Sequence, residues 1–296
     1  MLKEIHRPTR YPAKLLNLIL NDEYELEKKN EDEHVSSIPS YCIEMPRVVL
    51  TPTRLVVLGY SIEMSNRVTR QFDHKFIRLS FVDDDMSNLF GDDFSEHLCK
   101  HIEDTTVRGF TVNGHHYRFL AYSSSQLKEK SMWMVSCSNR EKDYIRSWMG
   151  DFNNIKLPSK YAARMGQCFS TTIQTLSGNS HTRGFFFSNS SNYLKVCDDL
   201  NDIEVGNFCH SDGTGLIHQD VLRKALKFVP FAPTDLNDVS IVQIRFGGAK
   251  GTLTSWDFNT IQGLKKNSRS ADVYLRPSMV KFKAPYHNLE IISIGR

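Results

Sequence analysis

Gln243-Ile-Arg-Phe-Gly-Gly-Ala-Lys-Gly251 combines the pattern of a strand with a glycine turn and two isolated basic side chains. Apolar and polar residues alternate from Val242 to Phe246, which predicts a strand with one buried and one polar face. Arg245 lies on the polar face. The two glycines that follow allow another backbone or a ligand to approach closely, and Lys250 stands beyond them as a point charge for phosphate.

Two neighbouring segments also combine turns with isolated basic residues. Ser211-Asp-Gly-Thr-Gly215 predicts a tight turn whose backbone amides form an anion nest, although Asp-Gly also marks any hairpin. Leu275-Arg-Pro-Ser-Met-Val-Lys-Phe282 carries Arg276 and Lys281. Its alternation predicts that Val280 and Phe282 face a core and that Lys281 points the opposite way. Each basic residue taken alone is a solvated strand residue, but together, beside glycines, they favour a phosphate site.

The clearest helix is predicted to begin after Pro158. Its apolar residues recur at i, i+4 and i+7, at Tyr161, Met165 and Cys168. Lys160 and Arg164 lie one turn apart on its polar face. This pair forms either a clamp for a phosphate or the solvated side of an ordinary amphipathic helix. The residues alone do not separate the two interpretations.

A shorter helix is predicted to start at Ser65, whose side chain would cap it. It carries Arg67 and Arg70. These two arginines either touch nucleic acid or form a solvated helix face, and the solvated face is the favoured interpretation. A strand is predicted from Leu289 to Ile294, close to the last residue. It fits a truncated domain, with a short terminal edge strand as the alternative.

The order of these segments resembles that of the eukaryotic cellular RNA-dependent RNA polymerases of the RNA-silencing pathway, from about Ser40 to Leu289. Further matching segments are Thr51-Pro-Thr-Arg54, Ser65-Asn-Arg-Val68, Arg78-Leu-Ser-Phe-Val-Asp83, Phe119-Leu-Ala-Tyr-Ser-Ser-Ser-Gln-Leu127, Ile145-Arg-Ser-Trp-Met-Gly-Asp-Phe152 and Lys160-Tyr-Ala-Ala-Arg-Met-Gly-Gln-Cys-Phe169. The resemblance implies an α+β, β-rich fold: the first double-psi β-barrel with surrounding helical and slab elements, truncated before the second barrel.

The resemblance also implies template-directed synthesis of RNA on RNA, with single-stranded RNA template and nucleoside triphosphates as partners and silencing-pathway proteins as further candidates. The residues expected to take part in catalysis are Lys250 and Lys281. The residues expected to bind nucleotide or RNA are Arg245, Lys160, Arg164 and Arg276.

The metal loop of this family, Asp-x-Asp-Gly-Asp, does not occur in the 296 residues. Nucleotidyl transfer uses two divalent ions, about 3.5–4 Å apart, which carboxylates must hold. Asp83-Asp84-Asp85 is a poor substitute, because adjacent residues of an extended chain point to opposite faces, and it is predicted to be an acidic loop. Mg²⁺ is therefore expected on the missing second barrel, and this fragment alone is expected to be inactive.

Composition predicts four parts. Residues 1–37 form a peripheral lead-in, acidic from Asn21 to Glu33; residues 38–176 form the slab and helical region; residues 177–199 form a Ser/Asn-rich loop or insertion; residues 200–296 form the first, incomplete barrel. Phe185 to Phe187 in the third part either stack on bases or tuck the loop onto the body. Residues 259–271 are expected to form an exposed basic loop.

Charge and cysteine usage narrow the class of protein. The net charge is only +3, but Val239 to Arg296 holds nine Lys or Arg against three acids, which fits a phosphate partner or surface solubility. The six cysteines form no Cys-x-x-Cys pair, which argues against zinc and disulfides and favours the cytoplasm or nucleus. The apolar run from Leu15 to Leu20 is too short to cross a bilayer, and no membrane partner is expected.

Two functions stay open at this point. The favoured one is a fragment of an RNA-directed RNA polymerase that makes double-stranded RNA from a single-stranded template for siRNA production, with catalysis completed by missing sequence. The alternative is a non-catalytic protein that binds nucleic acid or a partner protein, or a remnant of a polymerase gene.

Overall fold

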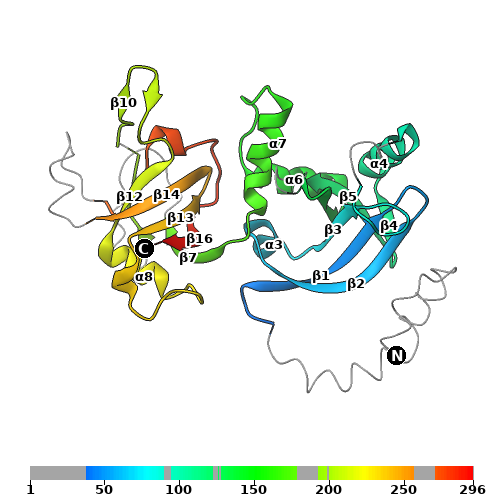
Figure 1. The fold of residues 1–296 in the computed structure, drawn as a ribbon, viewed down its shortest axis with the longest axis horizontal. Helices are drawn as coiled ribbons and strands as arrows, with labels where there is room; N and C mark the ends of the chain where they lie inside the picture. Colours follow the sequence, from blue (N-terminus) through cyan, green and yellow to red (C-terminus); the bar gives the residue numbers. More distant parts are fainter. Residues whose placement is uncertain are drawn as a thin grey trace. The chain divides into compact units, whose positions relative to one another are not determined.

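The structure is a computed structural model that describes residues 38–89, 95–122, 126, 128–178, 193–198, 200–256 and 271–295. The predictions for residues 1–37, for Phe185 to Phe187 and for the basic loop before Ala271 lie outside the described residues. The chain divides into two compact units (Figure 1). The four-part division stays a prediction.

Unit 1 comprises Met1–Glu63, His74–Leu120 and Gln126–Cys137. Its described part contains a six-stranded sheet in the order β2-β1-β3-β6-β5-β4. The elements are β1 (Cys42–Leu50), β2 (Leu55–Met64), β3 (Lys75–Phe81), α4 (Glu96–Arg108), β4 (Phe110–Val112), β5 (His115–Ala121) and β6 (Ser131–Ser136). β3 lies between a parallel neighbour, β1, and an antiparallel neighbour, β6. Its apolar residues, such as Ile77 and Leu79, are fully buried.

Unit 2 contains the segments with the predicted site. Its described part holds an eight-stranded mixed sheet in the order β8-β7-β16-β13-β14-β12-β15-β9 (Figure 1). The strands are β7 (Ile173–Gly178), β8 (Tyr193–Leu194), β9 (Val196–Cys197), β12 (Thr214–His218), β13 (Ile241–Phe246), β14 (Ala249–Trp256), β15 (Val273–Tyr274) and β16 (Asn288–Gly295). A separate hairpin joins β10 (Glu204–Val205) and β11 (Phe208–Cys209). The helices are α3 (Arg67–Gln71), α6 (Asn139–Met149), α7 (Pro158–Gly166) and α8 (Gln219–Leu226).

The predicted strand and glycine turn form the hairpin of β13 and β14. Val242 and Ile244 are fully buried while Gln243 is exposed, which confirms the predicted alternation. A Cβ atom on Gly248 would overlap the backbone carbonyl of Phe282. The close approach that glycine permits here is therefore that of another backbone.

The strand predicted from Leu289 to Ile294 is confirmed as β16, but the alternation predicted from Met279 to Phe282 is only partly right. β16 is no edge strand, because it pairs with β13 on one side and with β7 on the other. Between Leu275 and Phe282 the chain makes a 3₁₀ turn over Pro277–Met279, which interrupts the two-residue period. Val280 is consequently 45% exposed, against the prediction, whereas Phe282 is buried as predicted and Met279 is buried as well.

Candidate nucleic-acid interface

Four basic residues come together on unit 2. Arg245 on β13 and Lys250 on β14 are cross-strand partners in the hairpin. Burial lowers the pKa of Lys250, and the positive charges of nearby residues lower it further, namely Arg245, Arg164 and Lys281. We call Arg164, Arg245, Lys250 and Lys281 the basic cluster. Helix α7, the central hairpin and the segment after the 3₁₀ turn each contribute to it.

Little negative charge balances the basic cluster. Asp212, in the turn before β12, lies 3.9 Å from the Lys281 ammonium group, and its side chain is mostly exposed. The Lys281 ammonium group also donates a hydrogen bond to the Ser278 carbonyl. Among the described residues, the charges that act on Lys250 are three cations and the exposed Asp212 carboxylate, so a bound polyanion would relieve the repulsion between the cations.

Arg245 is a member of the basic cluster with a hydrogen-bond donor that is unpaired among the described residues. Burial, followed by the charge of Arg67, lowers its pKa to about 10. Its Nη1 donates to the Ile244 carbonyl at 3.0 Å, whereas its Nε atom is buried without a hydrogen-bond partner in the part of the chain that the structure describes. A partly buried guanidinium group with an unpaired donor is well suited to donate hydrogen bonds to a phosphate oxygen.

The carbonyl groups of the turn before Lys250 accept hydrogen bonds from two side chains and from one backbone N–H group. Arg67 Nη1 donates to the Gly247 carbonyl at 2.6 Å. Gln167 Nε2 donates to the carbonyl of Gly248 at 3.3 Å and to that of the next residue at 3.4 Å. The backbone N–H of Lys281 also donates to the Gly248 carbonyl, at 3.1 Å. The positions of Lys250 and Lys281 are thereby linked through one peptide unit.

Arg67 and Arg70 belong to a buried ion-pair network, and both interpretations of them from the sequence are wrong. Arg67 donates to the Glu290 carboxylate from Nε at 2.9 Å and from Nη2 at 2.5 Å. Arg70 pairs with the other oxygen of Glu290, which also accepts from Thr172 Oγ1 at 2.9 Å. Burial acts to lower the pKa of Arg67, but the charge of Glu290, the hydrogen bonds that Glu290 accepts from Arg67 and the nearby Cys168 and Tyr286 side chains together outweigh burial, and the pKa is raised.

The sequence did contain one signal for this network. Glu290 is a single acidic residue inside the apolar strand β16, between Leu289 and Ile291, and all three are fully buried. A charge in such a position requires an opposite charge. The helix that supplies it is capped by Asn66 and not by Ser65, and its first turn carries Arg67 into the interior.

A family model described as RNA dependent RNA polymerase matches residues 50–296. This chain belongs to that family. RNA-dependent RNA polymerase 1 of Arabidopsis thaliana is 33% identical over 273 residues, which are 87% of this chain and 22% of the relative. RNA-dependent RNA polymerase 1 of Schizosaccharomyces pombe is 32% identical over 303 positions, with 96% of this chain and 23% of the relative covered. The chain thus spans less than a quarter of these two polymerases.

A solved polymerase has the same fold. RNA dependent RNA polymerase QDE-1 from Thielavia terrestris superposes with a TM-score of 0.61 at 16% identity, over 98% of this chain and 34% of that chain. The predicted β-rich polymerase fold, with part of a double-psi barrel, is confirmed by this match. The chain covers only a portion of the polymerase, as predicted.

Two of the six predicted site residues lie outside the basic cluster of this polymerase segment. Lys160 is exposed one turn before Arg164 on α7. Arg276 is buried, and it donates to the Thr214 carbonyl at 2.8 Å and to the Asn201 carbonyl. These contacts connect two backbone segments and do not favour the predicted RNA contact by Arg276.

The turn from Ser211 to Gly215 does not favour an anion nest. The Gly213 N–H donates to Ser278 Oγ at 3.2 Å, and the Thr214 N–H donates to the Ser211 carbonyl at 3.0 Å. Both amides are thus used within the fold. Asp202 holds the same region together, and hydrogen bonds from Ser278 and Ser211 lower its pKa even though burial acts to raise it.

The acidic stretch after β3 forms a turn, as predicted. Asp84 accepts a hydrogen bond from Thr53 Oγ1 at 2.7 Å, and hydrogen bonds from Thr51 and Thr53 lower its pKa. Within the described ranges no group of three or more His, Cys, Asp or Glu residues is arranged to hold a metal ion. These residues therefore do not fit the divalent-metal site of a polymerase.

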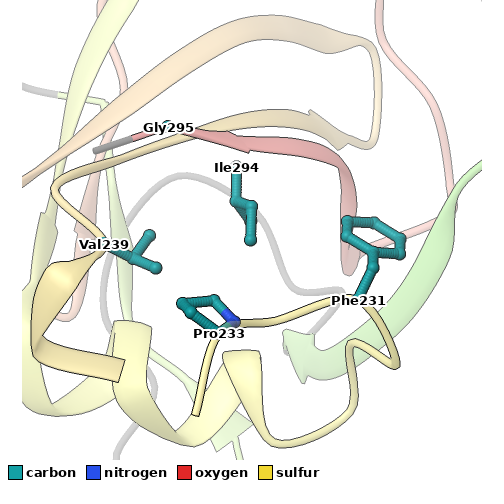
Figure 2. A pocket seen from close by; sticks show the side chains of 5 residues that line it. All are labelled: Phe231, Pro233, Val239, Ile294 and Gly295. Atoms are coloured by element: carbon teal, nitrogen blue, oxygen red, sulfur yellow. The ribbon is translucent and has the colours of Figure 1, made fainter. Parts of the chain in front are cut away.

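A hollow of about 340 Å³ lies beside the C-terminal end of β16 (Figure 2). It is lined by Phe231, Pro233, Val239, Ile294 and Gly295. Gly295 pairs with Ile241, the first residue of β13, whereas Arg245 lies near its last. The hollow is separate from the site and has no charged side chain in its lining. None of the helices described here is long and apolar enough to cross a membrane.

Proposed function

We propose that this chain supplies the nucleotide- and RNA-binding side of an RNA-directed RNA polymerase that copies single-stranded RNA into double-stranded RNA. The observation that carries the proposal is the convergence of the basic cluster. Arg245 and Lys250 come from the hairpin, Arg164 from α7 and Lys281 from the segment after the 3₁₀ turn, and the other three are close enough to Lys250 to lower its pKa. Membership of the polymerase family gives that cluster its partners, a single-stranded RNA template and nucleoside triphosphates.

The proposed roles follow from the chemistry of each side chain. Lys250 and Lys281 act as point charges that neutralise phosphates of the bound nucleotide during transfer. Arg245 offers a planar fork to phosphate oxygens, and Arg164 extends the positive charge onto α7. Lys160, one turn earlier on the same helix, lies where the RNA backbone would continue.

The metal belongs to another part of the polymerase in this proposal. Mg²⁺, when bound, would activate the attacking hydroxyl and neutralise the leaving pyrophosphate. The carboxylates that hold it are proposed to lie on a second barrel, in the portion of the relatives that this chain does not span. This chain by itself would then bind RNA without extending it, within RNA silencing in the cytoplasm or nucleus.

Binding of single-stranded RNA tests the proposal. Lys250→Ala and Lys281→Ala are each expected to weaken binding, because each removes a cation from the basic cluster. Each should also reduce the slope of log affinity against log salt by about 0.7, the value for one phosphate contact on a single strand. Lys227→Ala, at an exposed lysine at the end of α8, is the control and should change neither quantity. Unchanged affinity and slope in both cluster variants would refute the proposed interface.

A non-catalytic RNA-binding protein is the second candidate, because the described residues bring together cations but no metal-binding carboxylates. Sequencing of the complete transcript separates the two. An in-frame Asp-x-Asp-Gly-Asp motif after Arg296 supports the polymerase. A stop codon directly after Arg296 would exclude catalysis by this product, whatever RNA it binds.

A further inference from the structure

Helix α7 presents an exposed aromatic ring beside the basic cluster. Tyr161 is 40% exposed, although the sequence pattern placed it on the apolar side of the helix. Arg164 follows Tyr161 by three residues and Lys160 by four, so its side chain neighbours both on the helix surface. The helix contains two basic residues and no acidic residue.

The ring of Tyr161 is fixed by aromatic contacts that extend to the segment carrying Lys281. Its centroid lies 5.7 Å from that of Phe152, in an edge arrangement. Phe152 in turn packs against Phe282 at 4.8 Å. Phe282 directly follows Lys281, and its carbonyl lies against Gly248 in the turn that carries Lys250.

The other end of α7 is tied to the same turn. Gln167, which caps the helix, is buried and donates to the Gly248 and Ala249 carbonyls. Between the two ends, the charge of Arg164 reaches Lys250 and lowers its pKa. The Tyr161 ring is therefore held at a set position relative to the phosphate-binding residues, and it needs little ordering on binding.

We propose that the exposed face of Tyr161 stacks on a base of single-stranded RNA whose phosphates bind Arg164 and Lys250. This inference rests on the proposed function, in which the basic cluster binds the phosphates of the RNA. It adds a contact for one of the bases. Every base has a π-face, so the contact tolerates any sequence. Lys160 and Arg164 lie on the same helix as the ring and favour a polyanion over an apolar protein surface as its occupant.

Two probes separate stacking from phosphate binding, a single-stranded oligouridylate and inorganic tripolyphosphate. Tyr161→Ala is expected to weaken oligouridylate binding about 5-fold or more and to leave tripolyphosphate binding unchanged. The salt slope should stay the same, because stacking displaces no counterion. Tyr161→Phe keeps the ring and should bind as the native chain does. Tyr144→Ala is the matched control, since Tyr144 on α6 is 63% exposed and should not contribute.

The outcomes distinguish this inference from the proposed function. The stacking role is overturned if Tyr161→Ala binds oligouridylate with native affinity, or if it loses affinity equally for both probes. The proposed function survives either result as long as Lys250→Ala weakens the binding of both probes. If Lys250→Ala changes neither probe, the proposed function itself fails. Photocrosslinking of 4-thiouridine RNA to the unaltered chain gives a test that needs no variant. A crosslink on the peptide with Tyr161 supports the inference, and crosslinks only elsewhere contradict it.

Discussion

Glu290→Gln is expected to lower the free energy of unfolding of this chain by about 3–5 kcal/mol, because it leaves two arginines without their counter-charge. Glu290 is fully buried and accepts hydrogen bonds from Arg67, Arg70 and Thr172. The amide keeps the shape of the carboxylate but not its charge. Arg67 itself is buried and cannot turn to water. Urea denaturation followed by fluorescence of Trp148, whose ring lies 5.4 Å from Tyr286 near this network, measures the loss.

A surface ion pair provides the control for this prediction. Glu129 pairs with Arg78 in unit 1, and its side chain is 58% exposed. Glu129→Gln should cost no more than about 1 kcal/mol, because exposed pairs are screened by solvent. Equal and small losses in the two variants would mean that the buried network contributes no more than a surface pair.

Gly248→Ala is expected to lower the free energy of unfolding by at least about 3 kcal/mol, since the new Cβ atom has no space. It would overlap the Phe282 carbonyl, which belongs to the backbone and cannot rotate away. Any relief must separate the β13 and β14 turn from the segment carrying Lys281. RNA binding should therefore fall as well, because the hydrogen bond from the Lys281 N–H to the Gly248 carbonyl joins the two halves of the basic cluster.

Gly114→Ala is the matched control for this second prediction. Gly114 has a φ of +73° and nothing within 4 Å of an added Cβ atom, so only backbone strain of about 1–2 kcal/mol is expected. RNA affinity should not change in this variant. Urea denaturation and RNA titration of both variants measure the two effects. A Gly248→Ala chain with the stability and RNA affinity of the control would show that the turn has room to adjust.

Local patterns in the sequence were sufficient for much of the hairpin and for one helix. The alternation from Val242 to Phe246 and the two glycines after it correctly predicted β13 and its turn. The helical period after Pro158 correctly predicted α7, because the period and the proline both act within one or two turns. The same kind of pattern was misleading after Leu275, where Pro277 starts a 3₁₀ turn.

The order of short motifs along the chain was enough to indicate the polymerase family and the polymerase fold, since each motif is a local string of residues. Only the folded chain could reveal which side chains meet. Arg67 and Glu290 are 223 residues apart in sequence, and their pairing depends on the packing of α3 against β16. The same holds for Arg164 and Lys250, and for the choice of Phe282 as the neighbour of Gly248. Charge pairing and close packing act between atoms that are close in space. Neither produces a periodic sequence pattern from which the partner residue could be identified.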